Sequence, residues 1–318
     1  MILAAAAVAV APMTVSAPAS AAHAGAAAAA AAPCLTGSAA RLASARKVPE
    51  WRQRTDTNGV TQKDLDALPM RETKPKYIAR EVEPRLPAWV WIPVYVHVIR
   101  GTHKRDKPRI TNRAIANMIN ILNRGMEGRQ SSYSTNSRYR FYVHGITRTR
   151  KDSWYHAYLN GPRDRQAKQK LHRGNARALN LYFNGGGTAS DQVLGWSRFP
   201  WQYAYAPKLD GVSINVASVP GGRARGYNLG DTLIHETGHW LGLFHTFQGG
   251  CDDPGDYVSD TAPEAEPSYF CQVSRDTCLE PGLDPVRNFM DYSLDACMNM
   301  FTAGQVRRMD AAFEKWRY

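Results

Sequence analysis

Charged residues are absent from the first forty positions of this 318-residue chain, which contain no Lys, Arg, Asp or Glu and are rich in Ala. An apolar run at residues 1–10 precedes the small-residue triplet 19–21 (Ala-Ser-Ala), a pattern typical of a signal peptide and its cleavage site. Pro and Ser interrupt this stretch, which disfavours the alternative of an uncleaved membrane anchor. No later segment has 18 uninterrupted apolar residues. The pattern therefore predicts export of a soluble protein.

A concentrated basic arm is also missing, although Lys and Arg total 40 against 28 Asp and Glu and the net charge is +12. The excess is +4 before residue 89 (11 basic, 7 acidic) and +8 from there onward (29 and 21), so it is spread along the chain. The nearest approach to a basic stripe with aromatics is 148–170. That stretch also contains Asp152 and Asp164, and we expect it to be a solvated surface loop. These features predict no nucleic-acid partner.

The five cysteines include no CxxC pair, which disfavours a cysteine-ligated zinc site. Four of them lie between residues 251 and 297, and in an exported protein such a cluster predicts two disulfides with three connectivities open. Cys34 stands alone far upstream.

The chain divides by composition into an export segment (1–33), a polar pro-segment or linker (34–88) and a domain at 89–318. We expect strands at 89–99, 139–146, 178–183 and 212–216, with a short one in 191–197 beside the glycines at 185–187. Helices are expected at 111–126, 230–243 and 302–316. This order predicts an α+β fold with an N-terminal subdomain at 89–242 and a loop-rich, disulfide-stapled C-terminal subdomain at 243–318.

The most informative run, residues 235–245, reads His-Glu-Thr-Gly-His-Trp-Leu-Gly-Leu-Phe-His. A spacing of four puts His235 and His239 on one helix face, where both imidazoles can bind one ion. Gly242 tolerates the left-handed conformation that ends a helix, so His245 can return as a third ligand. Three imidazoles and one open position are typical of catalytic zinc. Glu236 is then placed to act as general base on the zinc-bound water and to pass the proton to the leaving amine.

A second element, 288–293, reads Asn-Phe-Met-Asp-Tyr-Ser. By itself a Met followed by a Tyr is consistent with plain core packing. Combined with the long histidine motif, it matches the Met-turn signature of metzincin peptidases. Met290 would then form an apolar floor beneath the zinc histidines, and Tyr292 could donate a hydrogen bond to the oxyanion of the tetrahedral intermediate.

These motifs resemble the pappalysin family of metzincins, and most of all its short secreted microbial members. The likeness covers about residues 89–318 and is most specific at 228–309. Further matching segments are 194–196 (Leu-Gly-Trp), 249–251 (Gly-Gly-Cys), 260–261 (Asp-Thr), 297–298 (Cys-Met) and 301–309. The resemblance implies a metzincin-type zincin with a twisted mixed β-sheet, a backing helix and an active-site helix. It also implies a secreted, extracellular zinc endopeptidase made as a zymogen.

The resemblance implies further site features. It pairs Cys251 with Cys278 and Cys271 with Cys297. It implies structural Ca²⁺ in the loop after the zinc motif, for which the oxygen-bearing candidates are Asp252, Asp253, Asp256, Asp260 and Thr261. It makes Leu194, Gly195 and Trp196 the cleft-edge strand that pairs with an extended peptide. It also implies a carboxylate pocket for an Arg after the scissile bond, for which Asp295 is the candidate.

Cys34 is a candidate zymogen switch, because a thiolate is a good zinc ligand and could occupy the open zinc position until the pro-segment is removed. The alternative is an incidental thiol in the export region. The predicted partners are protein and peptide substrates, with no stable membrane association after signal removal and no prediction of oligomeric state. The alternative function is a catalytically silent zinc-binding secreted module, which the intact Glu236 argues against.

Overall fold

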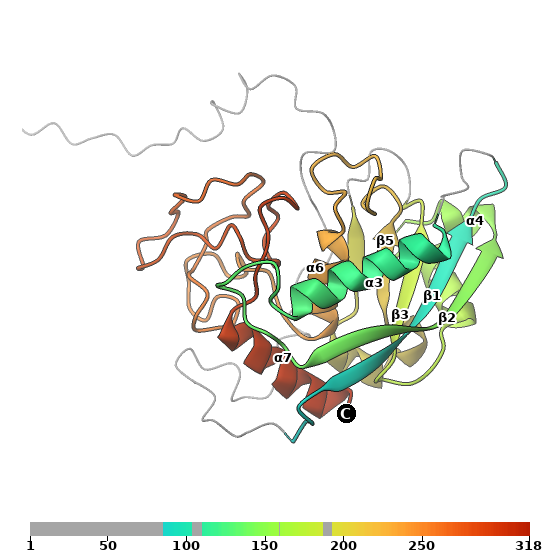
Figure 1. Cartoon of the computed structure of the whole chain (residues 1–318), viewed down its shortest axis with the longest axis horizontal. Coiled ribbons are helices and arrows are strands. Elements are labelled where there is room, and N and C mark those ends of the chain that lie inside the picture. Colours follow the sequence, from blue (N-terminus) through green and yellow to red (C-terminus); the bar gives the residue numbers. More distant parts are fainter. Residues whose placement is uncertain (1–84, 104–109, 159, 187–192) are drawn as a thin grey trace, which may run out of the picture. The chain divides into compact units, whose positions relative to one another are not determined.

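A five-stranded sheet in the order β2-β1-β3-β5-β4 forms the centre of the fold (Figure 1). The structure is a computed structural model that describes residues 85–103, 110–158, 160–186 and 193–318. The predicted export segment and almost all of the predicted pro-segment, with Cys34, lie outside the described residues.

Four strands of the sheet are parallel, and the edge strand β4 is antiparallel to β5. The strands are β1 (Val90–Arg100), β2 (Tyr139–Arg150), β3 (Leu179–Asn184), β4 (Gly195–Ser197) and β5 (Val212–Asn215). The predicted strands therefore lie in the right places, although β2 runs four residues further than expected. Within the short strand expected at 191–197, the last three residues form β4, which pairs with β5. Residues 191–192, and the last of the glycines at 185–187, lie outside the described residues.

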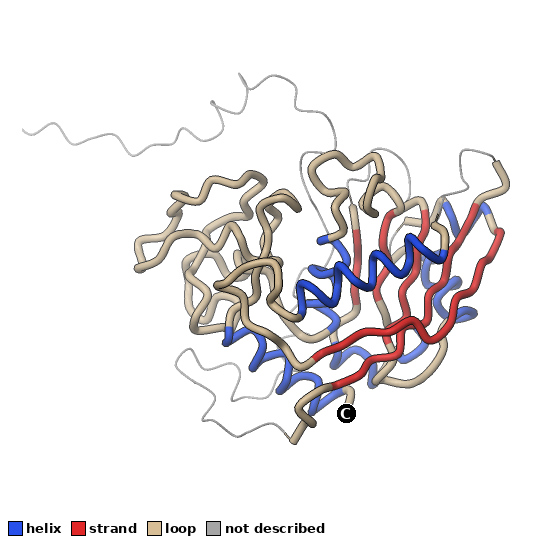
Figure 2. The backbone as a smooth tube through the Cα atoms, in the orientation of Figure 1, coloured by secondary structure: helices blue, strands red, loops and turns tan. Residues whose placement is uncertain are grey.

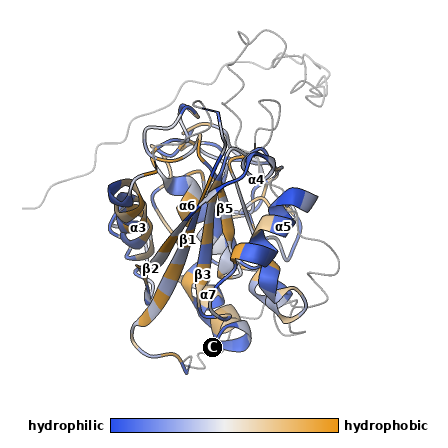
Figure 3. Cartoon of the chain, turned by 90° about the vertical axis from the view of Figure 1, so that its right-hand side faces the viewer, coloured by the Kyte–Doolittle hydropathy of each residue, from blue (hydrophilic) through white to orange (hydrophobic). Residues whose placement is uncertain are grey.

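Helices cover both faces of the sheet, with α3 (Asn112–Met126) on one side and α5 (Pro162–Leu171) on the other (Figure 3). Every residue of β3 and β5 is buried as a result, and their sequences are correspondingly dominated by apolar and uncharged residues. The apolar residues of the strands, of α3 and of α6 (Asp231–Trp240) form one main core.

Helix α3 (Asn112–Met126) begins where the sequence predicts, because the Thr111 hydroxyl accepts a hydrogen bond from the Ala114 amide. Its apolar residues Ile115, Met118, Ile119 and Leu122 are buried. Helix α6 (Asp231–Trp240) packs closely against it: a Cβ on Gly125 would lie 2.6 Å from the Ile234 side chain. This close approach sets the depth at which α6 lies in the fold.

Helix α7 (Ala303–Trp316) closes the chain and holds the far end of α6. Thr302 and Gln305 form a capping box at its start. Just after its end, the buried Arg317 forms two hydrogen bonds of 3.0 Å with Asp210, which also accepts from the Trp240 indole at 3.0 Å. Trp240 is the last residue of α6, so this cluster connects the C-terminal segment to the active-site helix.

The expectation of a basic surface loop at 148–170 is wrong. The segment contains the end of β2 and two helices, α4 (Asp152–Tyr155) and α5 (Pro162–Leu171). Helix α5 has few apolar residues, so it lacks the period that reveals a helix in a sequence. On its inner side Asp164 and Lys168 are almost completely buried and form an ion pair of 3.1 Å.

After α6 the chain becomes the loop-rich region that the sequence predicts, with a bridge between Asn288 and Met300 (Figure 2). Two disulfides join Cys251 to Cys278 and Cys271 to Cys297, the pairing that the resemblance implies. Two short 3-10 helices, η2 (Pro200–Ala204) and η3 (Pro207–Leu209), follow β4. None of the helices in the described residues is long and apolar enough to cross a membrane.

Candidate metal and catalytic site

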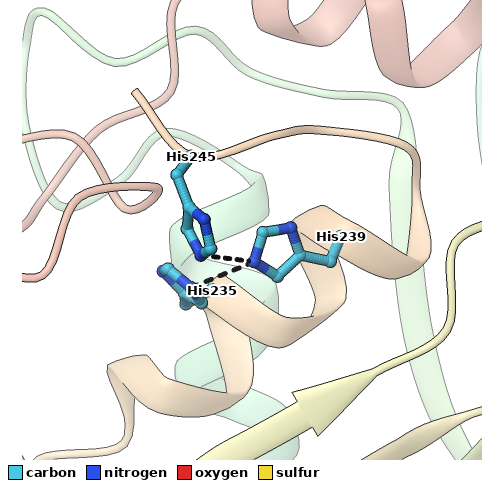
Figure 4. Close-up of side chains that lie close together, drawn as sticks. All are labelled: His235, His239 and His245. Carbon is cyan, nitrogen blue, oxygen red and sulfur yellow. Dashed lines mark hydrogen bonds between the residues drawn. The ribbon is translucent and has the colours of Figure 1, made fainter. Parts of the chain in front are cut away.

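Three histidine side chains converge at the end of α6 (Figure 4). His235 and His239 come from successive turns of the helix, and His245 comes from the segment that follows it. The Nε2 atom of His239 lies 3.2 Å from Nε2 of His235 and 3.1 Å from Nε2 of His245. All three residues are buried. The spacing of the motif therefore does place the three imidazoles together.

The return of His245 depends on an early end to the helix. The predicted helix extends to 243, but α6 ends at Trp240, which is three residues shorter. Gly242 has a φ of +102°, in the left-handed region that favours glycine, and the Leu243 amide donates back to the Gly238 carbonyl. A Cβ at Gly242 would also lie 2.7 Å from the Ala312 side chain. Both the backbone and the packing thus require glycine here.

The histidine hydrogen bonds fit a bound metal. Nδ1 of His235 lies 2.6 Å from the Phe289 carbonyl, and Nδ1 of His239 lies 2.7 Å from the Leu243 carbonyl. A carbonyl only accepts, so both Nδ1 atoms carry the proton and both Nε2 atoms present lone pairs. Tetrahedral zinc with bonds of about 2.0–2.1 Å requires nitrogens roughly 3.3–3.4 Å apart, close to what is found. These two backbone carbonyls fix the orientation of the imidazole rings, as hydrogen-bond acceptors beside zinc-binding histidines commonly do.

The edge strand β4 passes directly beside Glu236. A Cβ on Gly195 would lie 2.6 Å from both Cγ and Oε1 of Glu236, which is 1% exposed. Alternation along the strand directs Trp196 to the opposite face, where its ring lies 4.2 Å from Nζ of Lys168. Leu194 is buried, and its carbonyl accepts from the Asn215 amide. The predicted cleft-edge residues therefore lie beside the predicted catalytic carboxylate.

Met290 and Tyr292 lie next to the histidine cluster. Met290 is fully buried, and its sulfur lies where a side chain on Gly238 of α6 would be. Its amide donates to the Asn288 side chain, which in turn exchanges two hydrogen bonds with Gln305. The Tyr292 ring centroid lies 5.0 Å from that of His245. The turn is thus held beneath the active-site helix, as the Met-turn interpretation requires.

Asp295 is buried and does not face solvent. Its Oδ2 atom accepts from the amides of Leu229 and Gly230 at 2.8 and 3.1 Å, immediately before α6. A carboxylate at the start of a helix is stabilised by the positive end of the helix dipole. Asp295 therefore helps to fix the start of α6, and its predicted role in a substrate pocket stays a prediction.

The predicted calcium candidates are used in protein contacts. Asp260 accepts from the Thr302 hydroxyl and the Gly304 amide at the start of α7, both at 2.7 Å. The Thr261 hydroxyl lies 2.8 Å from both carboxylate oxygens of the buried Asp256, and Asp253 is exposed. Within the described ranges, no metal-ligand cluster contains these acids. The other such cluster, around Cys251, uses disulfide-bonded cysteines. Calcium binding at these residues stays a prediction.

A buried acidic group supports the segment after His245, and the sequence offers no local pattern for it. The Thr246 hydroxyl donates to Glu264 at 2.9 Å, and Glu264 pairs with Arg275 at 2.7 Å. Burial, followed by the nearby Asp291 carboxylate, raises the pKa of Glu264 to about 9. The residues of this buried group, from Thr246 to Asp291, are up to 45 positions apart, so only the tertiary structure brings them together.

The fold and the histidine site define a zinc-dependent metalloendopeptidase of the metzincin type. The Peptidase_M43 family model, described as pregnancy-associated plasma protein-A, matches residues 174–314. Extracellular metalloprotease 1 of Coccidioides posadasii is 38% identical over 237 residues, which cover 73% of this chain and 80% of that relative. An extracellular metalloprotease of Pyricularia oryzae is 37% identical over 228 residues, 71% of this chain and 76% of the relative.

Solved structures agree with the sequence relatives. Mature mirolysin of Tannerella forsythia, in complex with a cleaved peptide, is 28% identical with a TM-score of 0.59 and covers 72% of this chain and 93% of that chain. A promirolysin mutant from the same organism has a TM-score of 0.60 at 28% identity and covers 72% and 82%. The chain belongs to peptidase family M43, the pappalysins.

Proposed function

We propose that this chain is a secreted endopeptidase, made as a zymogen, in which His235, His239 and His245 hold one zinc ion and Glu236 is the general base. The carrying observation is the convergence of three Nε2 atoms, two of them on rings whose Nδ1 atoms donate to backbone carbonyls. Bound zinc supplies Lewis acidity toward the scissile carbonyl and a more acidic water.

The side chains around the ion then have distinct roles. Glu236 takes a proton during attack on the peptide carbonyl and returns it to the leaving amine, and its burial beside β4 keeps it in place. Tyr292 donates a hydrogen bond from its hydroxyl to the developing oxyanion, and its place beside His245 supports this role. Met290 packs beneath α6 and holds the histidine rings in position at the metal site.

The substrate is an extended peptide that adds to the outer edge of β4. Within the described residues β4 is the last strand of the sheet, with β5 on its other side. An extended peptide can bind such an edge through main-chain hydrogen bonds. The bound peptide in the mirolysin complex supports a peptide substrate here.

The zymogen proposal assigns 1–33 to export and 34–88 to a pro-segment, with Cys34 as the switch and catalysis at 89–318. The existence of a pro-form of mirolysin and the extracellular relatives support it. Replacing Cys34 with Ser should produce activity before processing. Unchanged latency of the variant, measured on the unprocessed chain, would eliminate the switch.

The central test compares processed protein with its Glu236→Gln variant by casein zymography and metal analysis. We expect one zinc per chain in both proteins and hydrolysis in the unaltered protein alone. Glu280→Gln is the matched control, because Glu280 is an exposed glutamate, and it should retain full activity. Zinc binding without hydrolysis in the unaltered protein would identify a silent zinc-binding module instead.

A further inference from the structure

A cavity of about 420 Å³ lies between α5 and the 3-10 helices that follow β4. Helix α5, which forms one wall of the cavity, lies on the side of the sheet opposite α3 (Figure 3). The walls are formed by Arg165, Gln169, Arg198, Tyr205, Ala206, Pro207, Lys208 and Leu209. The catalytic proposal assigns no role to any of these residues.

The lining of this cavity carries three cations and no carboxylate: Arg165 from α5, Arg198 from the residue after β4, and Lys208 from η3. The acids that act electrostatically on Arg198 from nearby are Asp164 and Asp210. Each of these carboxylates forms an ion pair with a different cation.

Asp164 forms its ion pair with the buried Lys168 at 3.1 Å. Asp210 binds both terminal nitrogens of the buried Arg317. The positive charge of the three lining cations is therefore not balanced within the cavity wall. A concave site lined by one sign of charge concentrates the field and attracts an ion of the opposite sign.

The guanidinium of Arg198 contains a buried donor, its Nε atom, which has no hydrogen-bond partner among the residues that the structure describes. Its Cζ atom lies 5.1 Å from the Trp196 ring, which holds the guanidinium against the back of β4. Burial lowers the pKa of Arg198, and the charge of Arg165 acts in the same direction. An anion in the cavity that pairs with this guanidinium would offset both costs.

We propose that this cavity binds a tetrahedral oxyanion, the phosphate or sulfate group, through Arg198, Arg165 and Lys208. A guanidinium presents paired donors that match two oxygens of such a group, and Lys adds a point charge. The cavity is larger than one phosphate ion, and Ala206, Pro207 and Leu209 supply an apolar wall, so an esterified phosphate fits as well as the free ion. This proposal does not depend on catalysis.

Calorimetric titration of the full chain with inorganic phosphate, at constant ionic strength set with NaCl, tests the proposal. We expect saturable binding that weakens when the NaCl concentration is raised. Arg198→Gln, Arg165→Gln and Lys208→Gln should each raise Kd roughly tenfold or more. Arg113→Gln is the control, because Arg113 is an exposed arginine of α3 on the other face of the sheet, and its Kd should not change.

Hydrogen exchange locates the ion independently of affinity. Phosphate should slow amide exchange in 198–210 and leave α3 unchanged. Absence of saturable binding would overturn the proposal. Binding that persists in all three cavity variants would also overturn it, because the ion would then occupy another site, such as the catalytic metal. Arg165 and Lys208 are exposed, so two of the three variants do not endanger folding.

Phenyl phosphate in place of inorganic phosphate distinguishes the two sources of the group. Tighter binding of the ester, lost in the same three variants, supports a phosphorylated or sulfated small molecule as the ligand. Equal or weaker binding of the ester, with phosphate binding lost in the variants, supports the free ion.

Discussion

Gly195 is the position at which one added methyl group should separate binding of zinc from catalysis. Its φ lies outside the left-handed range, so alanine is compatible with the backbone there. The added Cβ would lie 2.6 Å from Cγ and Oε1 of Glu236, whereas ordinary contacts begin at 3.4 Å. The strand cannot easily withdraw, because Trp196 is paired with Ser213 and stacked on Lys168. Glu236 must therefore move.

The shortfall in contact distance is 0.8 Å, which sets the size of the expected effect. A displacement of about 1 Å at a reacting group can cost roughly a hundredfold in rate. We expect Gly195→Ala to lower kcat/KM about a hundredfold, with most of the loss in kcat. The three atoms nearest to this methyl position all belong to Glu236 and none to a histidine, so zinc content should stay at one per chain.

The assay measures kcat and KM on a fluorogenic peptide, together with zinc content and thermal unfolding. Gly145→Ala is the matched control: Gly145 is also a strand glycine, but the nearest atom to its added Cβ is Tyr95 Cδ1 at 3.7 Å. It should keep activity within about twofold. A Gly195→Ala enzyme with unchanged kcat and normal zinc content would refute the reasoning.

Three further changes test other parts of the structure. Lys168→Met should destabilise the fold by about 3–5 kcal/mol in urea unfolding, because it leaves Asp164 charged and buried without its cation. The control Lys170→Met, on the exposed side of α5, should change the free energy of unfolding by less than about 0.5 kcal/mol. Burial lowers the pKa of His97 from 6.5 to about 4, so the unfolded chain binds more protons between these values. Stability should therefore fall as the pH drops from 6.5 toward 4, by at most about 3 kcal/mol from this group, and His97→Asn should remove that slope in pH-dependent unfolding. Removing zinc with 1,10-phenanthroline should lower Tm, and added zinc should restore it, since the three histidines bind metal only when folded; an unchanged Tm would contradict the histidine site.

Part of the site was predictable because its information is local. The spacing of His235 and His239 determines their common helix face, and Gly242 marks the reversal that returns His245. Helices α3 and α7 begin directly after Thr111 and Thr302, close to the predicted starts, because each hydroxyl caps its own helix. Strands β3 and β5 were also recognisable, since burial on both faces selects short apolar runs, and β1 and β2 were recognisable from their partial alternation.

Other features required the tertiary structure, because they join residues far apart in the chain. Helix α5 escaped prediction because its buried side holds an ion pair, Asp164 with Lys168, and a charged pair has no apolar period. The same holds for Asp295 at the start of α6 and for Gly195 against Glu236, separated by 41 positions in the sequence. The amino-acid order by itself determined which residues could meet a metal on one helix. Only three-dimensional packing decided what lies next to them, because a contact across the chain depends on how the whole core closes.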